Sequence, residues 1–267
     1  AAELEVVRGT SDARRRFIDR GVASLHPGYV QIVADYGRVI KQKNRILQDA
    51  NEQGLPLLEV EDLISPWNEQ LVGLAWEVHS ARSDYIRRIN EVLERGLFEQ
   101  RDVHINYVSS LEGKGDLTEY KLLVSQRLGL RLQAELAAGR SLIGPHRDDL
   151  KVLLEGREMK VFGSAGQQRS ALLLLDLAAI SVYNSWHGDY PLFLIDDVDA
   201  ELDERRIGFL LEYLENRTQT FITTSKRTHL EDFLERARVY EIVDGAALGG
   251  QQKARDLPQD LATLETI

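Results

Sequence analysis

Residues 192–203, LFLIDDVDAELD, decide the fold class that the sequence predicts. The stretch opens with an apolar run, 192–195, typical of a strand buried on both faces of a parallel sheet. Asp196 and Asp197 follow at the carboxyl end of this strand, which is the edge where open α/β sheets bind ligands. Two carboxylates at that edge can hold a hydrated magnesium ion and orient a water molecule. We therefore expect a strand that ends in a metal and nucleotide site.

A second stretch, GSAGQQRSALLLLDLAAI at 163–180, predicts a phosphate-binding helix start. The first amides of a helix lack partners inside the helix and lie at the positive end of its dipole. Gly166 lets the backbone come close to a ligand, and the hydroxyl of Ser164 adds a donor. The residues after the turn are apolar almost all round, which favours a buried helix. An ordinary buried helix behind a glycine turn is the alternative interpretation.

Taken together, these motifs resemble the ABC-type ATPases of DNA maintenance, and within that group the RecF family. The resemblance rests on the Ser-x-Gly-Gln turn, the Asp-Asp strand end and the strand FITTSK at 221–226. GPHRDDL at 144–150 and TSDARRRFIDR at 10–20 resemble RecF signatures, in the right order. The similarity covers most of residues 1–245. It implies an α/β fold, with an ABC-type ATPase lobe built on a mostly parallel sheet and an α-helical antiparallel hairpin as an arm.

The resemblance also implies roles for individual residues. Asp196 would coordinate Mg²⁺, and Asp197 would position the attacking water, with slow turnover because Asp stands where such ATPases more often have Glu. The γ-phosphate of ATP, held by the P-loop of a second subunit, would be contacted by the signature turn, so that the site requires a homodimer. The nucleotide-binding residues would be Ser164, Gly166, Gln167, Asp203 and Thr224.

The sequence contains no P-loop, which would read Gly-x-x-x-x-Gly-Lys-Ser/Thr. Its only Gly-Lys pair, Gly113-Lys114, is followed by Gly115 and has Val108 where the first glycine should stand. The only methionine is Met159. We therefore expect an amino-terminally truncated protein, inactive as an ATPase by itself, with processing of a complete protein as the alternative.

Composition limits the kinds of partner. The net charge of −10 argues against a surface that is basic throughout, so DNA would have to meet a local basic patch. Cysteine is absent, which excludes disulfides and thiolate metal sites. No apolar run approaches the roughly 18 residues of a membrane span, so we expect a cytoplasmic protein with no membrane partner.

Two clusters of basic residues are candidates for the DNA surface. The candidate DNA-binding residues are Arg14, Arg15 and Arg16 in one cluster, and Lys41 and Lys43 in the other. Few aromatic residues lie between them, so contacts to the DNA backbone without base readout are expected. Solvated helix faces are the alternative for both clusters.

Periodicity predicts the organisation of the chain. We expect residues 1–10 to belong to the ATPase lobe, with an edge strand at 3–8, and 11–102 to form the helical arm. A helix capped by Ser11 or Asp12 should run to about Leu25. The ATPase lobe should resume at 103–245, with a strand at 104–110, a helix at 117–138, a hairpin at 149–162, a helix at 203–216, and strands at 220–224 and 239–243. Residues 246–267 read as a flexible tail.

The arm should be an antiparallel hairpin of two helices joined by a linker containing Gly54, Pro56 and Pro66. Spacings of three and four predict a seam in each helix. The predicted seam residues are Val30, Val33, Gly37, Ile40, Asn44 and Leu47 in the first helix, and Leu71, Leu74, Val78, Ala81 and Tyr85 in the second. Asn44 either fixes the register within the seam or faces solvent.

His146 and Arg147 have two possible roles. Their position between Gly144-Pro145 and Asp148-Asp149 indicates a fixed turn whose charged groups pair with each other. Alternatively, Arg147 contacts nucleotide or DNA.

The leading hypothesis, implied by the resemblance, is an ATP-gated clamp of recombinational repair. It would dimerise on gapped DNA where single strand meets duplex, and help to load recombinase with the mediator proteins RecR and RecO. A nucleotide-independent DNA- or protein-binding scaffold is the second hypothesis. A two-metal nuclease using Asp148, Asp149, Asp196 and Asp197 is a third.

Overall fold

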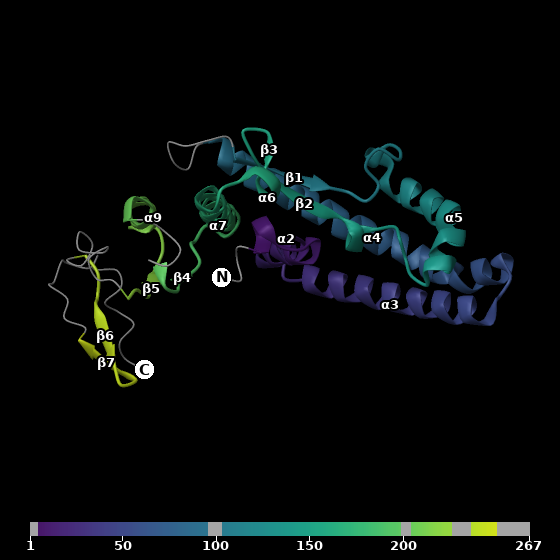
Figure 1. Ribbon diagram of the computed structural model, residues 1–267, viewed down its shortest axis with the longest axis horizontal. Helices are drawn as coiled ribbons and strands as arrows, with labels where there is room; N and C mark the ends of the chain where they lie inside the picture. The colour runs from purple at the N-terminus through teal and green to yellow at the C-terminus, as the bar shows by residue number, and fades with distance from the viewer. Residues whose placement is uncertain (1–4, 96–102, 199–203, 226–235, 250–267) are drawn as a thin grey trace. The chain divides into compact units, whose positions relative to one another are not determined.

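The computed structural model describes residues 5–95, 103–198, 204–225 and 236–249. The chain divides into two compact units, residues 1–191 and 192–267 (Figure 1). The division falls after Pro191 and not at residue 102, where we expected the arm to end. The reason is packing, because strand β1 (Val103–Val108) lies against the long helix of the arm.

Helix α4 (Leu57–Glu94) is the centre of the first unit. Four helices contact it: α2 (Ser11–Leu25), α3 (Tyr29–Gln53), α5 (Tyr120–Ala138) and α7 (Ala165–His187). Figure 1 shows α3 and α4 lying side by side. Short helical turns complete the unit: α1 (Glu5–Arg8), η1 (Leu117–Glu119), η2 (Pro145–Arg147) and α6 (Met159–Phe162).

An antiparallel sheet of β1, β2 (Asp149–Leu154) and β3 (Arg157–Glu158) covers one side of α4 and α2. Ile105 pairs with Val152, and both side chains are buried, as the alternation of a half-buried sheet requires. The turn between β2 and β3 has positive φ at Glu155 and Gly156, which suits a two-residue hairpin. The hairpin predicted at 149–162 ends at Glu158, because α6 begins at Met159.

The helical hairpin forms as predicted, and the predicted Leu47 is buried, but the buried face of the first turns of α3 is shifted by one position. Tyr29, Tyr36, Lys43 and Ala50 are buried at intervals of seven, whereas the predicted Val30 is 61% exposed. The aromatic side chains bury more area than the smaller residues beside them, and this determines which face turns inward. In α4 the predicted Leu71, Val78 and Tyr85 are buried.

Pro66 lies inside α4 and not in a linker. Proline removes one backbone hydrogen bond from a helix. Val60 and Ile64 on one side of it, and Leu71 on the other, are almost completely buried, and this apolar burial offsets the lost bond. The linker is therefore only the short turn at Gly54, whose φ of 66° is left-handed.

The predicted edge strand at 3–8 is wrong, because residues 5–8 form α1. Val6 and Val7 are adjacent and both buried, which a strand with one covered face does not allow. Residues 3 and 4 lie outside the described residues. Thr10, and not Ser11 or Asp12, caps α2 by accepting a hydrogen bond from the amide of Ala13.

The second unit contains the acidic strand. Strand β4 (Phe193–Ile195) pairs in parallel with β5 (Thr220–Ile222), and α9 (Glu204–Leu214) lies between them in the chain. Within the described residues, parallel pairing occurs only here. Leu194 and its partner Phe221 are 71% and 54% exposed, so β4 is not buried on both faces as expected. The physical reason is that β4 has β5 as its only described neighbour.

Strands β6 (Tyr240–Val243) and β7 (Ala246–Gly249) form a separate antiparallel hairpin. Asp244 and Gly245 both have positive φ, as in a type I′ turn. Residues 246–249 were expected to belong to the tail, and this part of the prediction is wrong. The remainder of the predicted tail lies outside the described residues. In the part of the chain that the structure describes, no helix is long and apolar enough to cross a membrane.

A buried ion pair joins α3 to α5. The Nζ atom of Lys43 lies 2.6 Å from the carboxylate of Glu135, and both side chains are completely buried. Burial lowers the pKa of the Lys43 ammonium, and the carboxylate of Glu135 only partly compensates. The other oxygen of Glu135 accepts hydrogen bonds from Ser141 and Leu142. Lys43 is therefore part of the core.

We expect Lys43→Met to destabilise the protein by about 3–5 kcal/mol, because it leaves the Glu135 carboxylate buried without its cation. The double variant Lys43→Met/Glu135→Gln should recover most of this loss, since glutamine keeps an acceptor for Ser141 and Leu142. Urea unfolding of the three proteins measures both effects. Equal stability of Lys43→Met and the parent protein would contradict the structural role.

Candidate functional site

The acidic pair lies at the carboxyl ends of the two parallel strands, where the sequence placed it. Thr223, directly after β5, connects the two carboxylate residues. Its Oγ1 donates to the carboxylate of Asp196 at 2.5 Å and accepts from the amide of Asp197 at 2.8 Å. Asp197 has a φ of 51°, a left-handed conformation that this hydrogen bond holds in place. The sequence analysis missed Thr223, although the run of threonines after β5 could have indicated it.

These residues fit a magnesium ion bound together with a nucleotide. Asp196 and Asp197 are both exposed, so their carboxylates can reach a ligand in solvent. Magnesium commonly binds one or two carboxylates and takes its other ligands from water and phosphate. The described residues contain no group of three or more acidic or histidine side chains that could hold a metal ion. The two carboxylates therefore suit a Mg²⁺ ion that takes its other ligands from water and the phosphates of a nucleotide, and not an ion coordinated by protein side chains alone.

The predicted signature turn is the amino-terminal cap of α7. The Oγ of Ser164 accepts from the amide of Gln167 at 3.3 Å, and the amide of Ser164 donates to the Gln167 side chain at 2.9 Å. This capping box leaves the hydroxyl hydrogen of Ser164 available to a ligand. The amides of Ala165 and Gly166 lack partners within the helix, as the first amides of any helix do. The turn can therefore present three donors to an anion.

Buried contacts hold this turn from behind. The side chain of Gln168 donates to the carbonyl of Met159 at 2.9 Å and accepts from Arg8 of α1. A side chain at Gly163 would place its Cβ 2.6 Å from the same carbonyl oxygen, so only glycine fits. Sequence analysis did not single out Gln168, whose importance depends on contacts 9 and 160 residues away in the chain.

The predicted nucleotide residues fall in different units. Ser164, Gly166 and Gln167 belong to the first unit, while Asp196, Asp197 and Thr224 belong to the second. Thr224 lies two residues beyond β5. Asp203 is outside the described residues.

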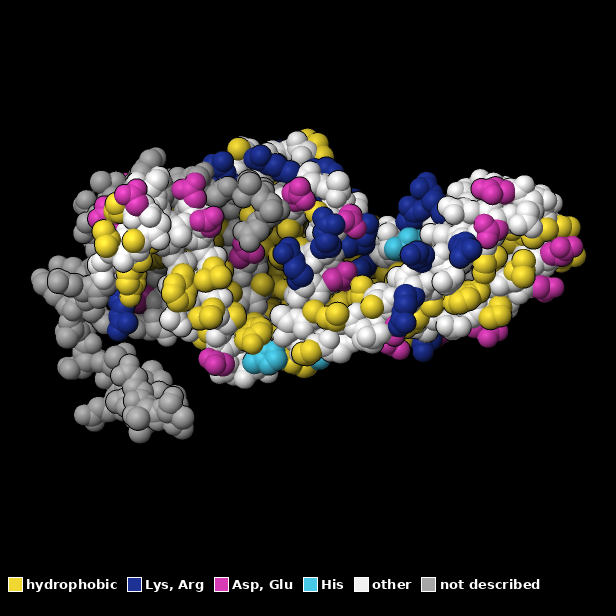
Figure 2. Space-filling view, turned by 90° about the horizontal axis from the view of Figure 1, so that it is seen from below, with side chains coloured by type: hydrophobic (Ala, Val, Ile, Leu, Met, Phe, Trp, Pro, Cys, Tyr) yellow, Lys and Arg dark blue, Asp and Glu magenta, His cyan; other side chains and the backbone are white. Residues whose placement is uncertain are grey.

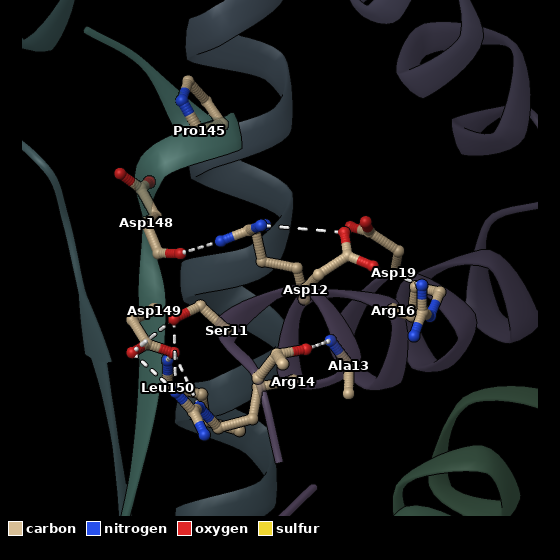
Figure 3. Close-up of polar contacts among 12 residues, drawn as sticks. Ser11, Asp12, Ala13, Arg14, Arg16, Asp19, Pro145, Asp148, Asp149 and Leu150 are labelled. Atoms are coloured by element: carbon tan, nitrogen blue, oxygen red, sulfur yellow. Dashed lines mark hydrogen bonds and ion pairs between the residues drawn. The ribbon is translucent and has the colours of Figure 1, made fainter. Parts of the chain in front are cut away.

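The residues of the motif GPHRDDL form hydrogen bonds with other segments of the first unit, and its charged side chains do not pair with one another. Asp149 accepts two hydrogen bonds from Arg14, at 2.7 and 2.8 Å, and one from Ser11 at 3.0 Å. Figure 3 shows the side chain of Arg14 reaching from α2 to Asp149 at the start of β2. Burial tends to raise the pKa of Asp149, but the guanidinium of Arg14 holds it below the usual range.

Asp148 points into the core. Its carboxylate is completely buried and accepts hydrogen bonds from Tyr107 at 2.5 Å and from the amide of Ser110 at 2.6 Å. Burial would raise the pKa of Asp148, but these donors and the nearby His79 lower it. Asp148 therefore ties β1 to the motif and cannot bind a metal in solvent. Since Asp149 is also paired, the two-metal nuclease hypothesis loses two of its four carboxylates.

His146 is held between α3 and the turn that follows α5. Its Nδ1 lies 2.6 Å from the hydroxyl of Tyr36 on α3, and its Nε2 lies 3.3 Å from the carbonyl oxygen of Ser141. Burial, followed by the charges of Arg147 and Arg15, lowers the pKa of His146 to about 4. His146 therefore stays neutral near pH 7 and is a packing residue.

The structure reduces the predicted DNA-binding set. Arg14 is 5% exposed and bound to Asp149, and Lys43 is completely buried with Glu135, so neither reaches a DNA phosphate. The charge of each residue made it a candidate for binding DNA, but in the fold a carboxylate partner neutralises that charge. Arg16 and Lys41 are exposed, and Arg15 is partly exposed. Arg16 is paired with Asp12.

The neighbouring segment adds basic residues that the sequence analysis did not assign to DNA. Arg147 is exposed at the end of η2, and Arg140 is exposed in the turn after α5. Figure 2 shows Lys and Arg side chains gathered beside a histidine on one face of the first unit. A tertiary contact brings Arg15 of α2 to this segment, because its guanidinium donates to the carbonyl oxygen of Asp148 at 2.8 Å.

An acidic pair after a parallel strand, a capped helix at the signature turn and a helical hairpin arm define an ABC-type ATPase fold. No family model matches the chain. The chain is 36% identical over 252 residues to the DNA replication and repair protein RecF of Heliobacterium modesticaldum, covering 91% of this chain and 66% of the relative. It is 32% identical over 264 residues to that of Desulforamulus reducens, covering 96% and 67%.

The fold agrees with two solved RecF structures. They are described as the recombination mediator protein RecF-ATPrS and RecF-ATP in the RecFOR pathway, with TM-scores of 0.78 and 0.77. Both are 25% identical, and each match covers 92% of this chain and 65% of the other chain. The chain belongs to the RecF family, as its motifs predicted, and it spans about two thirds of the length of the relatives it matches.

We expect Thr223→Val to disorder the acidic strand end, because valine keeps the shape but removes both hydrogen bonds to Asp196 and Asp197. If Asp196 and Asp197 act in ATP hydrolysis, the hydrolysis rate should fall by up to about a hundredfold, the size of effect that a misplacement of about 1 Å can produce. Thr223→Ser keeps the hydroxyl and should retain activity. A Thr223→Val protein as active as the serine variant would contradict this arrangement.

We expect an NMR titration of His146 to give a midpoint near pH 4, far below the ordinary 6.5. The folded state binds the proton more weakly than the unfolded state, so the contribution of His146 to stability is complete above pH 6.5. That contribution is lost as the pH falls from 6.5 to 4. His146→Gln identifies the resonance, and a midpoint near 6.5 would show that the imidazole is not buried as described.

Proposed function

We propose that this chain works in an ATP-gated DNA clamp of recombinational repair. The observation that carries the proposal is the acidic pair at the carboxyl ends of β4 and β5, held by Thr223, in a chain of the RecF family. A solved relative described as RecF-ATP in the RecFOR pathway supports ATP as the ligand. The clamp would act without changing any bond in the DNA.

Each part of the site has a role in this proposal. Asp196 would bind Mg²⁺, and the exposed Asp197 would orient the attacking water and accept its proton. Bound Mg²⁺ would offset the charge that develops on the phosphate oxygens. Across a homodimer, the Ser164 hydroxyl and the amides that begin α7 would bind the γ-phosphate of ATP held by the other subunit. Gly166, Gln167, Asp203 and Thr224 complete the proposed nucleotide contacts.

ATP would thereby control dimerisation. Binding would join two subunits on DNA, and hydrolysis would remove the γ-phosphate that links them. The proposed substrate is gapped DNA at the junction of single strand and duplex, where the clamp would assist recombinase loading. RecR and RecO are the proposed protein partners, supported by the RecFOR pathway to which the solved relatives belong.

A nucleotide-independent scaffold that binds DNA or protein is the second candidate. It is favoured by the lack of a Gly-x-x-x-x-Gly-Lys-Ser/Thr sequence in the 267 residues. In that case Ser164 and Gln167 only cap α7. Association and DNA binding that do not change with ATP would support this second function.

We expect Ser164→Arg to abolish ATP-dependent dimerisation of the intact protein, because the large cation occupies the place of the phosphate and removes its hydroxyl donor. Sedimentation velocity with and without ATP and Mg²⁺ measures the effect. Ser185→Arg is the matched control, since Ser185 is exposed near the other end of the same helix. Unchanged ATP-dependent dimerisation of a folded Ser164→Arg protein would contradict the sandwiched nucleotide.

A further inference from the structure

Three arginines from separate parts of the first unit lie close together. Arg15 is on α2, Arg140 is in the turn after α5, and Arg147 ends η2. Arg15 donates to the carbonyl oxygen of Asp148, the residue after Arg147, and Arg147 donates to the carbonyl oxygen of Ser141, the residue after Arg140. Burial and the charges of Arg140 and Arg15 accordingly lower the pKa of Arg147. Folding thus brings together like charges that would repel one another without a counter-ion.

The carboxylates near this cluster are already engaged. Asp148 points its carboxylate into the core and offers the cluster only its carbonyl oxygen, which accepts from Arg15 at 2.8 Å. Glu135 is completely buried with Lys43. Asp12 is shared between Arg15 and Arg16. None of these carboxylates pairs with the guanidinium of Arg140 or Arg147 among the described residues.

The two exposed arginines keep donors for a ligand. Arg147 donates from Nε and Nη2 to the carbonyl oxygen of Ser141, at 3.3 and 3.0 Å, which fixes its guanidinium, and its Nη1 has no partner among the described residues. In the part of the chain described, the side chain of Arg140 has no ion pair or hydrogen bond. Guanidinium groups bind phosphate oxygens with strong, charge-assisted hydrogen bonds.

The segment that carries Arg140 and Arg147 is rigidly mounted. The amide of Ser141 donates to Asn44 of α3 at 2.7 Å, so Asn44 holds the turn after α5, a role different from the two expected from the sequence. Tyr36, two turns earlier on the same helix, holds His146. Lys41 precedes Asn44 by three residues and therefore lies on the same side of α3. The backbone of the segment that carries Arg140 and Arg147 is thus held against α3, so it loses little entropy when a ligand binds.

We infer that Arg15, Arg140, Arg147 and Lys41 form a surface that binds the sugar–phosphate backbone of duplex DNA. The inference rests on the proposed DNA clamp and identifies where it holds DNA. Single-strand binding usually combines basic residues with exposed aromatic rings on which bases stack. Tyr36, the aromatic residue beside the cluster, is buried. The surface therefore suits phosphates and not unpaired bases.

A purely structural role for Arg140 makes a different prediction. Arg140 follows the carboxyl end of α5, where a cation stabilises the helix dipole. If this were its only role, its removal would lower stability and leave DNA affinity unchanged. Measuring stability and affinity on the same variant separates the two roles.

The test compares Arg140→Ala/Arg147→Ala with the parent protein by fluorescence anisotropy of a labelled DNA duplex, with and without ATP and Mg²⁺, over a range of salt concentrations. We expect roughly tenfold weaker binding and a salt slope smaller by about 2, since each lost phosphate contact removes about 0.9 from the slope. Arg87→Ala is the matched control, because Arg87 is an exposed arginine neutralised by Asp84 and Glu91.

Each outcome has a distinct meaning. Weaker binding and a smaller slope in the double variant, with the control unchanged, support the surface. The same affinity and slope as the parent protein would overturn the inference and leave the clamp intact. If the parent protein binds no duplex under any of these conditions, the DNA clamp itself fails. Urea unfolding of both variants confirms that the comparison is made between folded proteins.

Discussion

The guanidinium of Arg82 is the contact on which the rest of the first unit depends. It is 4% exposed and donates to both carboxylate oxygens of Asp19, at 2.8 and 2.9 Å, and to the carbonyl oxygen of Pro145 at 2.8 Å. One buried cation thereby joins α4, α2 and η2. Breaking a buried pair leaves a charge without compensation, which is strongly destabilising. The position of the whole 144–149 segment is coupled to the hairpin arm through this group.

The motif GPHRDDL divides its side chains between support and surface. Asp148 and Asp149 face inward, to Tyr107 and Arg14, and are held in their charged forms by these donors. Arg147 faces solvent from the same turn. The inward residues hold the turn in one conformation, and this makes the outward arginine a fixed donor and not a mobile side chain. Adjacent charged residues of one motif are thus divided between support inside the fold and exposure at its surface.

The second unit combines a sheet with exposed apolar side chains and a polar edge held by hydrogen bonds. Leu194 and Phe221 expose apolar surface on the pair β4–β5. At the carboxyl ends of the same strands, Thr223 connects Asp196 and Asp197 through a single hydroxyl. The geometry of the acidic pair therefore depends on the register of two strands, because Phe193 pairs with Thr220 and Ile195 with Ile222. Parallel pairing brings the two strand ends to the same edge.

The sequence by itself determined the class of fold, the RecF family, and most of the helices and strands, because these depend on local periodicity, caps and motifs. It also identified the acidic pair and Ser164 as candidates, since their chemistry is visible in their residue types. Only the tertiary structure decided which charges are available. Lys43 and Arg14 look like surface cations until Glu135 and Asp149, 92 and 135 residues away, bury and neutralise them. Thr223 and Gln168 gain their contacts in the same way, because long-range packing sets burial and partners, and no local pattern encodes it.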